Sequence, residues 1–309
     1  MLHSNYINPR IEFEDLANGD AEHGEVMFSF SAFLWLVPML LIGTLGSALT
    51  VSVGAVVLFV ITTLITLCFG HSLGMHRRFI HRSYRCPRWM ELMFLHLGTL
   101  VGLAGPIGML TTHDLRDWAQ RQACCHPFLC HDGGWMKDLY WQLLCNIKLS
   151  NPPLISIEND ILNDPWVRWI ERTWMLQQLP WAALFYVLGG WGWVCWGICS
   201  RVSVGVVGHW LIGYLAHNKG HRHWHVKNVA VQGHDIPWTS LLTMGECWHN
   251  NHHAFPYSAK LGLFKGQWDP GWEVLKLLEK AGLVSDLCVP DLVTLRPELE
   301  WYTPNPISD

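Results

Sequence analysis

The sequence has little charge for its length. Asp, Glu, Lys and Arg make up 15% of the 309 residues, against about 25% in typical soluble domains. The few charges nearly balance, at a net −4, and no run of Lys and Arg with interleaved aromatic residues occurs. Nucleic-acid-binding proteins need a basic face for the phosphates, so we expect no nucleic-acid partner.

Motifs for bound redox cofactors are also missing. The ten cysteines include no C-x-x-C pair, which argues against a cysteine-ligated iron–sulfur site and a c-type heme. No glycine-rich loop of the dinucleotide-binding kind occurs either. Any electrons that this chain uses must therefore come from another protein. We expect its cysteines to be mostly buried thiols in a reducing compartment.

Long apolar runs are what the sequence has instead. No charged residue occurs from Phe28 to Gly70, and Arg201 alone interrupts Trp174 to Tyr214. A bilayer-spanning helix needs about 20 apolar residues, so each run fits two spans. We expect links around Gly43 to Ser47 and at Gly189-Gly190. The predicted spans are approximately 28–45, 48–70, 174–190 and 193–214.

The fold predicted from these runs is an all-α integral membrane protein with four transmembrane helices in two hairpins. We interpret Leu92 to Leu110 as an interfacial or buried segment and expect a short amphipathic helix over Trp272 to Lys280. Arginines follow the first hairpin, which places that flank in the cytoplasm. The expected organisation is a polar segment 1–27, one membrane domain 28–290 with a cytosolic helical cap, and a tail 291–309.

The chain has 18 histidines, and every histidine-dense segment falls on the side that we assign to the cytoplasm. In Gly245 to Pro256, a helix would place His249, His252 and His253 on one face. His76 and His81 are five residues apart, about 140° on a regular helix, so they can share a centre only with other segments around it. His113 and Asp117 are one helical turn apart. A four-residue ladder, His217, His221 and His225, follows the last span.

Imidazole is a common ligand of iron, zinc and copper. The best-placed groups are too many for one tetrahedral ion and fit two metal ions. Two irons with nitrogen ligands can activate dioxygen, and the membrane supplies an apolar substrate, so oxidation of a lipid chain is the expected reaction. The candidate ligands are His76, His81, His113, Asp117, His217, His221, His249, His252 and His253.

Two long motifs resemble those of the membrane-bound fatty acid desaturases, closest to the acyl-CoA (delta-9-like) branch. The first reads G-x-H-R-x-x-x-H-R-S-Y from Gly74 to Tyr84, and the third reads G-E-x-W-H-N-x-H-H-x-F-P from Gly245 to Pro256. The resemblance covers roughly residues 28 to 290. It implies an O2-dependent di-iron enzyme that introduces a cis double bond into a fatty acyl chain.

The second motif departs from the family. The family reads H-R-x-H-H, whereas this chain has H-D-L-R-D from His113 to Asp117. Asp117 stands in the place of the last histidine, where it either binds iron or pairs with Arg116 or Arg121. A third alternative is that His126 and His131 fold back to fill the vacancy.

The family also has an Asn-x-x-x-His element after the last span. The resemblance makes His221 a ligand, and His217 stands at the asparagine that holds water near the metal, so it either does likewise or binds metal. His209, His223, His225 and His234 match no motif, and we expect them beside the ligands or on the surface.

The resemblance implies a fatty acyl substrate, linked to CoA, carrier protein or lipid. It also implies an external donor of the ferredoxin, rubredoxin or cytochrome b5 type, and a bacterial inner membrane with the active site facing the cytoplasm. Two alternatives remain: a lipid hydroxylase or other oxygenase of the same di-iron superfamily, and a non-catalytic metal-binding membrane protein.

Overall fold

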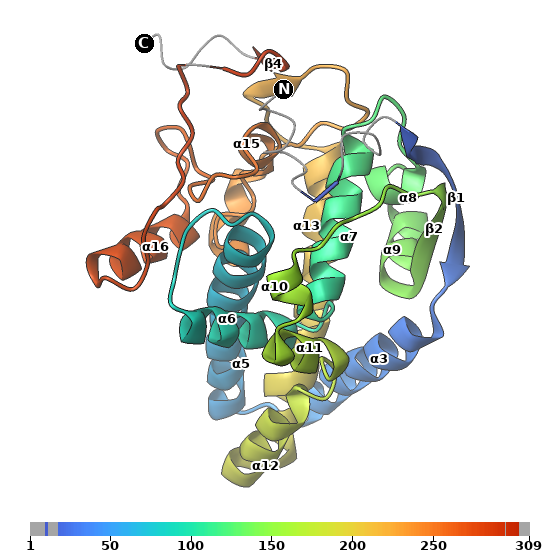
Figure 1. Ribbon diagram of the computed structural model, residues 1–309. Coiled ribbons are helices and arrows are strands. Elements are labelled where there is room, and N and C mark those ends of the chain that lie inside the picture. Colours follow the sequence, from blue (N-terminus) through green and yellow to red (C-terminus); the bar gives the residue numbers. More distant parts are fainter. Residues whose placement is uncertain (1–9, 12–17, 294, 303–309) are drawn as a thin grey trace.

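The computed structural model describes residues 10, 11, 18–293 and 295–302 (Figure 1). The expected N-terminal segment 1–27 and tail 291–309 therefore lie partly outside the described residues. Most of the described chain is helical. In Figure 1 the apolar helices extend toward the lower end, and many of the irregular segments lie toward the upper end.

Three helices are long and apolar enough to cross a membrane: Phe30–Leu49, Val53–Ile80 and Gln178–Asn218. The first two form the predicted first hairpin, and each begins at a serine cap. Ser29 Oγ accepts a hydrogen bond from the Ala32 amide, and Ser52 Oγ accepts one from the Ala55 amide. A serine in this position satisfies an amide that the first turn leaves unpaired.

The link of this hairpin lies near Thr50 and Ser52, not at Gly43 to Ser47 as the sequence suggested. The glycines serve close packing instead of a turn. A Cβ atom on Gly43 would lie 2.9 Å from the carbonyl carbon of Cys199, and one on Gly46 would lie 2.7 Å from Cys195 Sγ. The helices therefore approach so closely here that only glycine fits.

The third apolar helix comprises α12 (Gln178–Val194), the π-helical η3 (Cys195–Ser200) and α13 (Arg201–Asn218). It is interrupted at Gly190, whose φ of 67° and ψ of −162° are not helical. The residues on either side of this break pack together, since Phe185 forms one apolar cluster with Ile198 and Cys199. The predicted turn at Gly189-Gly190 is therefore a real interruption of the helix.

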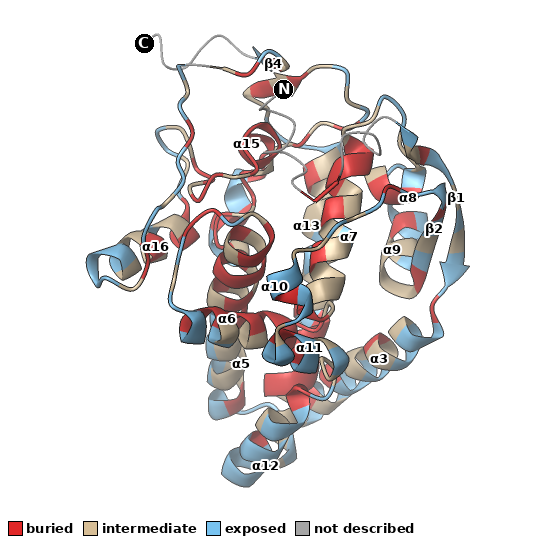
Figure 2. Ribbon diagram, in the orientation of Figure 1, coloured by how far each residue is buried: buried red, intermediate tan, exposed pale blue. Residues whose placement is uncertain are grey.

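The first apolar helix consists of α3 (Phe30–Leu41), η1 (Ile42–Gly46) and α4 (Ser47–Leu49). The second consists of α5 (Val53–Ile65) and η2 (Thr66–Ile80), and η2 is π-helical. Figure 2 shows much exposed surface on α3 and α12. Many of these exposed side chains are apolar, among them Leu34, Val187 and Trp191. A bilayer would cover this surface.

Arg201, the charged residue of the second apolar run, is buried. Its guanidinium donates to the carbonyls of Leu100 and Gly197 and to Gln178 Oε1. An arginine within an apolar span is thus paired with polar groups inside the bundle.

The residues between the hairpins form short elements. Leu92 to Leu110 is not a candidate span, because α6 ends at Leu100 and α7 begins at Pro106. The predicted amphipathic tail helix is present as α16. The helices outside the three apolar ones are α6 (Arg88–Leu100), α7 (Pro106–Gln120), α8 (Pro127–Cys130), α9 (Trp135–Leu144), α10 (Asn159–Leu162), α11 (Pro165–Arg172), η4 (Pro237–Thr239), α14 (Ser240–Thr243), α15 (His249–Ala254) and α16 (Pro270–Lys280).

Two small antiparallel sheets correct the all-α prediction. Strand β1 (Asp20–Phe28) pairs with β2 (Cys145–Asn151), and β3 (Trp224–Val226) pairs with β4 (Leu299–Trp301). β1 occupies part of the segment expected to be a polar extension. Its pairing register brings Phe28 opposite Cys145, at the start of the first apolar helix. Sequence periodicity missed these strands because each is short and needs a distant partner.

Candidate metal centre

The first histidine cluster consists of four imidazoles from three helices and one helix end. His76 lies in η2, His81 directly follows it, His113 lies in α7 and His252 lies in α15. One nitrogen from each ring lies within 4.8 Å of the corresponding atoms of the others. The ring centroids of His76 and His252 are 4.6 Å apart, and those of His81 and His113 are 4.8 Å apart. Four nitrogen donors are a complete set for one tetrahedral ion.

The π-helical form of η2 explains how His76 and His81 meet. The amide of His81 donates to the carbonyl of His76 at 3.0 Å, the five-residue spacing of a π-helix. Residues five apart then lie nearly above one another, and the two ring centroids are 4.7 Å apart. The regular-helix separation of about 140° does not apply here.

The second histidine cluster consists of His217, His249 and His253. The Nε2 atom of His249 lies 3.1 Å from that of His217 and 3.0 Å from that of His253. His217 Nδ1 lies 2.7 Å from the Gly213 carbonyl oxygen, which can only accept, so this nitrogen carries the proton and Nε2 has the lone pair. Three nitrogens that converge on one point are most of a metal site.

A single turn of α15 serves both clusters. His249 and His253 lie four residues apart and face the second cluster, while His252 faces the first. The sequence placed all three on one face toward the metal centre. In the structure the helix instead lies between two groups of imidazoles, and this places the clusters side by side.

Burial favours the neutral, metal-binding form of His81, His249, His252 and His253. It lowers the pKa of His81, His252 and His253 well below the usual range, and lowers that of His249 to about 3. Neighbouring imidazoles lower the pKa further, because two positive charges side by side would repel each other. Among the described residues, His81 Nε2, His113 Nδ1 and His252 Nδ1 are buried without a hydrogen-bond partner. Unpaired buried nitrogens beside one another fit a bound cation.

A buried ion network holds His76 in place. Glu246 Oε2 lies 2.7 Å from His76 Nδ1, off the axis of an ideal hydrogen bond. Glu246 also accepts from Ser72 Oγ and from Arg77 Nε. Burial alone would raise the pKa of Glu246, but the neighbouring His76 and Arg77 lower it below its usual range. This carboxylate therefore stays ionised and orients the imidazole, as carboxylates beside metal-bound histidines do.

Arg77 extends the network to the C-terminal part of the chain. Its Nη2 atom lies 2.9 Å from Asp269 Oδ1, and Asp269 also caps α16 by accepting from the Trp272 amide. Sequence reasoning missed Glu246, Arg77 and Asp269 as supporting residues. The first two lie inside the quoted motifs, but nothing local points to Asp269.

Asp117 and His221 belong to neither cluster. Asp117 Oδ2 lies 3.8 Å from Arg121 Nε. This ion pair is one of the alternatives that the sequence offered for Asp117. His221 is exposed, because α13 ends at Asn218 and the chain turns into an isolated bridge between His221 and Asp235. The predicted ladder of His217, His221 and His225 was therefore wrong. The structure brings together the other seven predicted groups.

The histidines without a motif occupy different surroundings. His131 is buried, and its ring stacks on that of His217 at 5.1 Å. His126 Nδ1 accepts from the Phe128 amide at the start of α8, away from the clusters. His209 lies against His71, with ring centroids 5.0 Å apart. Three more histidines, His223, His225 and His234, are half-buried.

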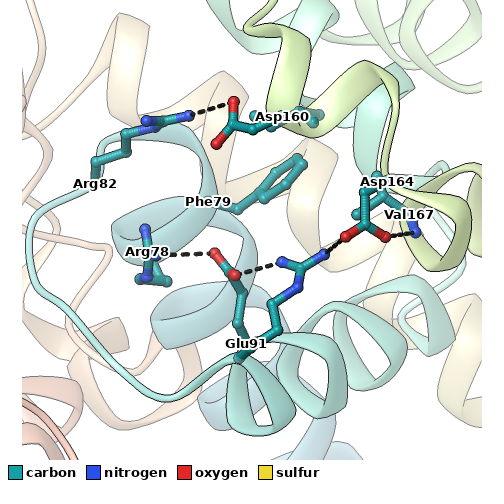
Figure 3. Close-up of a pocket in the computed structure, with 9 residues that line it drawn as sticks. Arg78, Phe79, Arg82, Glu91, Asp160, Asp164 and Val167 are labelled. Atoms are coloured by element: carbon teal, nitrogen blue, oxygen red, sulfur yellow. Dashed lines mark hydrogen bonds and ion pairs between the residues drawn. The ribbon is translucent and has the colours of Figure 1, made fainter.

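A pocket of about 220 Å³ lies beside the first motif. Figure 3 shows Arg78 pointing toward Glu91 and Arg82 pointing toward Asp160. Arg88 contacts both Glu91 and Asp164. Because each arginine has an acidic partner, the pocket has little net positive charge for an anion. Its contacts instead tie the end of η2 to α6, α10 and α11.

Comparison with known proteins identifies the family. No family model matches the chain. An acyl-CoA 5-desaturase of Anemone leveillei is 33% identical over 236 residues, which are 76% of this chain and 72% of the relative. The chain belongs to the fatty acid desaturase family. Two cyanobacterial desaturases agree with this assignment. The sn-2 palmitoyl-lipid 9-desaturase of a Nostoc strain is 31% identical over 69% of this chain and 74% of its own length. The sn-1 stearoyl-lipid 9-desaturase of Anabaena variabilis is 30% identical over 74% of this chain and 81% of its own length.

The desaturase is thus an oxidoreductase of lipid metabolism that acts on fatty acyl chains. Its three apolar helices fit a membrane enzyme. The two imidazole clusters agree with the metal dependence of the family.

Proposed function

We propose that the two histidine clusters hold two iron ions and that the desaturase introduces a cis double bond into a fatty acyl chain. The observation that carries this proposal is the convergence of seven imidazoles into two adjoining groups. Zinc alone would not perform this chemistry, because it has no redox change. Iron supplies the oxidation of an unactivated methylene by dioxygen.

The atoms of this reaction balance with an external reductant. Two hydrogens leave adjacent carbons of the acyl chain, and O2 takes these together with two electrons and two protons to form two waters. The protein holds the imidazoles, keeps them neutral by burial and positions the acyl chain. The electrons come from a ferredoxin, rubredoxin or cytochrome b5 type donor.

We also propose four membrane crossings. The helix Gln178–Asn218 has 41 residues, or about 60 Å at the helical rise, which is twice the roughly 30 Å hydrocarbon core. The break at Gly190 and the packing of Phe185 on Ile198 support an antiparallel pair. Both histidine clusters then lie in a helical cap outside the bilayer, within one membrane domain at residues 28–290.

The orientation follows from the charges that flank the second span. Arg77 and Arg78 lie at its end, and Arg82, Arg85 and Arg88 follow within ten residues. Positive residues favour the cytoplasmic side. We propose a bacterial plasma membrane, with the metal centre facing the cytoplasm.

For the substrate we propose an acyl-CoA or acyl-lipid, because relatives of both kinds match the chain. The position of the double bond depends on where the clusters lie along the bound chain. The second candidate function is hydroxylation of a lipid. It rests on Arg116 and Asp117, which replace two motif histidines and alter the ligands available to one metal.

Product analysis tests this proposal. The desaturase is expressed in a host without fatty acid desaturation, and its fatty acids are examined by mass spectrometry. A product two mass units lighter, with a cis double bond, supports desaturation. A product that has gained one oxygen supports hydroxylation. If the purified protein contains zinc but no iron and forms no product with a reductase system, the chain is a metal-binding homologue without this activity.

A further inference from the structure

The second cluster lacks a ligand that the first one has. It offers three imidazoles, against four in the first. Structural metal sites in proteins commonly take four ligands. The two substituted positions of the second motif, Arg116 and Asp117, supply neither a free imidazole nor an unpaired carboxylate. Another side chain near His217 must complete the set.

His131 has the support that a metal-bound histidine needs. Its Nδ1 atom lies 2.9 Å from Oδ2 of Asp138, which is fully buried. Asp138 also accepts from Trp210 Nε1 at 2.8 Å and from Gln142 Nε2 at 3.3 Å. Such a carboxylate fixes the tautomer and the ring orientation of a ligand histidine. Glu246 contacts His76 of the first cluster in a similar way.

The position of the His131 ring also fits. It stacks on the ring of His217 with 5.1 Å between centroids and 11° between planes. The backbone of His131 has a φ of 58° and ψ of 30°, in the left-handed region. This conformation is uncommon for a residue other than glycine, and it terminates α8 so that the side chain turns toward α13.

The lone pair of His131 faces Arg116. Nε2 of His131 lies 2.6 Å from Nη1 of Arg116. A guanidinium can only donate hydrogen bonds, so Nε2 is the unprotonated nitrogen and Nδ1 donates to Asp138. The imidazole thus presents a lone pair to a cation. Arg116 is held there by a second contact, from its Nη2 to Gln142 Oε1 at 2.7 Å.

We propose that His131 is the fourth imidazole of the second cluster and that Arg116 competes with the metal ion for its Nε2 lone pair. This inference rests on the proposed metal centre. When the second ion binds, Arg116 turns away and His131 joins His217, His249 and His253. The vacancy left by the altered second motif is then filled from a segment 14 residues beyond it.

The two other candidates have different partners. Asp117 pairs with Arg121, which also donates to the His253 carbonyl. His126 accepts a backbone hydrogen bond at the start of α8 through Nδ1. Neither has a buried carboxylate that orients it toward His217 among the described residues. His131 alone of the three has both an orienting partner and a place beside the cluster.

Metal titration of the full-length protein in detergent tests the proposal. The protein is stripped with a chelator and titrated with Co2+, and the bound metal is counted by mass spectrometry. Wild type is expected to bind two ions. His131→Gln is expected to bind one, while the matched controls His126→Gln and Asp117→Asn keep two. Retention of both ions by His131→Gln would overturn the proposal.

A second variant keeps the test open if His131→Gln does not fold. Arg116→Gln removes the competing guanidinium and leaves His131 intact. The second ion should then bind at least about tenfold more tightly, and unchanged or weaker binding would contradict the inference. A wild-type protein that binds no metal would instead refute the proposed function itself, so the two failures are distinguishable.

Discussion

The Nε2 atoms of His217 and His249 lie 3.1 Å apart, although 32 residues separate them in the chain. His217 is near the end of α13, and His249 begins α15. In the segment between them, the backbone of Asp235 forms isolated β-bridges with both His221 and Trp248. These bridges bring α15 against α13 and turn His221 outward. The relationship places His217 in the second cluster and leaves His221 outside it.

Replacing His217 by Asn, the residue that the family has there, tests this assignment. His217→Asn removes one of the imidazoles that form the second cluster, so we expect loss of the second metal. Turnover should fall at least about 100-fold, since even a residue that only supports a ligand contributes 10–100-fold. His221→Asn is the matched control and should keep activity. Full activity of His217→Asn with an inactive His221→Asn would reverse the two roles.

Glu246→Gln probes the carboxylate that orients His76. The variant keeps the shape of the Glu246 side chain but removes its negative charge, which lies beside both His76 and Arg77. We expect metal affinity of the first cluster to fall about 10–100-fold, measured by competition with a chelator. Glu273→Gln is the control, because Glu273 is exposed and pairs with Lys276. Equal affinities in the two variants would show that Glu246 plays no part.

The buried imidazoles predict acid sensitivity of the metal-free protein. The pKa of His249 falls to about 3 on folding, and those of His81, His252 and His253 also fall. Well above pH 6.5 these groups are neutral in both states and add no pH dependence. Below it the unfolded chain binds protons that the folded chain excludes, so the free energy of unfolding decreases by about 1 kcal/mol per group per pH unit.

This effect is measured by unfolding in detergent between pH 6.5 and 5. The free energy of unfolding should depend less steeply on pH in His249→Asn than in wild type, by the equivalent of about one proton. The variant lacks one imidazole that takes up a proton only when the chain unfolds. Bound metal should delay the loss of stability to lower pH, since a proton must then displace the ion. Identical slopes for wild type and His249→Asn would contradict the predicted neutral state.

Gly70→Ala tests the contact between η2 and α6. A Cβ atom at Gly70 would lie 2.4 Å from the amide nitrogen of Gly98 and 2.6 Å from the Leu97 carbonyl oxygen, both backbone atoms. The helices must separate, at a cost of about 1–3 kcal/mol, and the melting temperature should fall. In Gly208→Ala the new methyl group meets nothing within 4 Å. A similar melting temperature for both variants would show that the close approach does not matter.

The sequence predicted the apolar helices and the gathering of histidines well, for a physical reason. Long apolar runs and dense histidine motifs are local features, which the chain reveals without knowledge of its partners. Gly190 was identified as a break, and seven of the predicted ligand positions converge. The role of Gly43 and Gly46 was misjudged, because a glycine that permits a turn and one that permits close packing look alike in a sequence.

Other features depend on contacts between distant segments. The π-helical form of η2 brings His76 and His81 together, and residue spacing alone assigned them a regular helix. The short strand β1 needs its partner β2 to exist. The support that Asp138 gives to His131 appears only once α8 and α9 fold beside α13. These elements could not be derived from local periodicity.

The iron content of the purified protein tests the central claim most directly. The protein and its variants His252→Ala and His253→Ala are loaded with Fe2+ without oxygen, dialysed against a chelator, and analysed for metal and protein. The two-cluster arrangement predicts about two irons in wild type and about one in each variant, with the first cluster impaired in His252→Ala and the second in His253→Ala. A wild-type content of one ion, or no loss in either variant, would contradict the account.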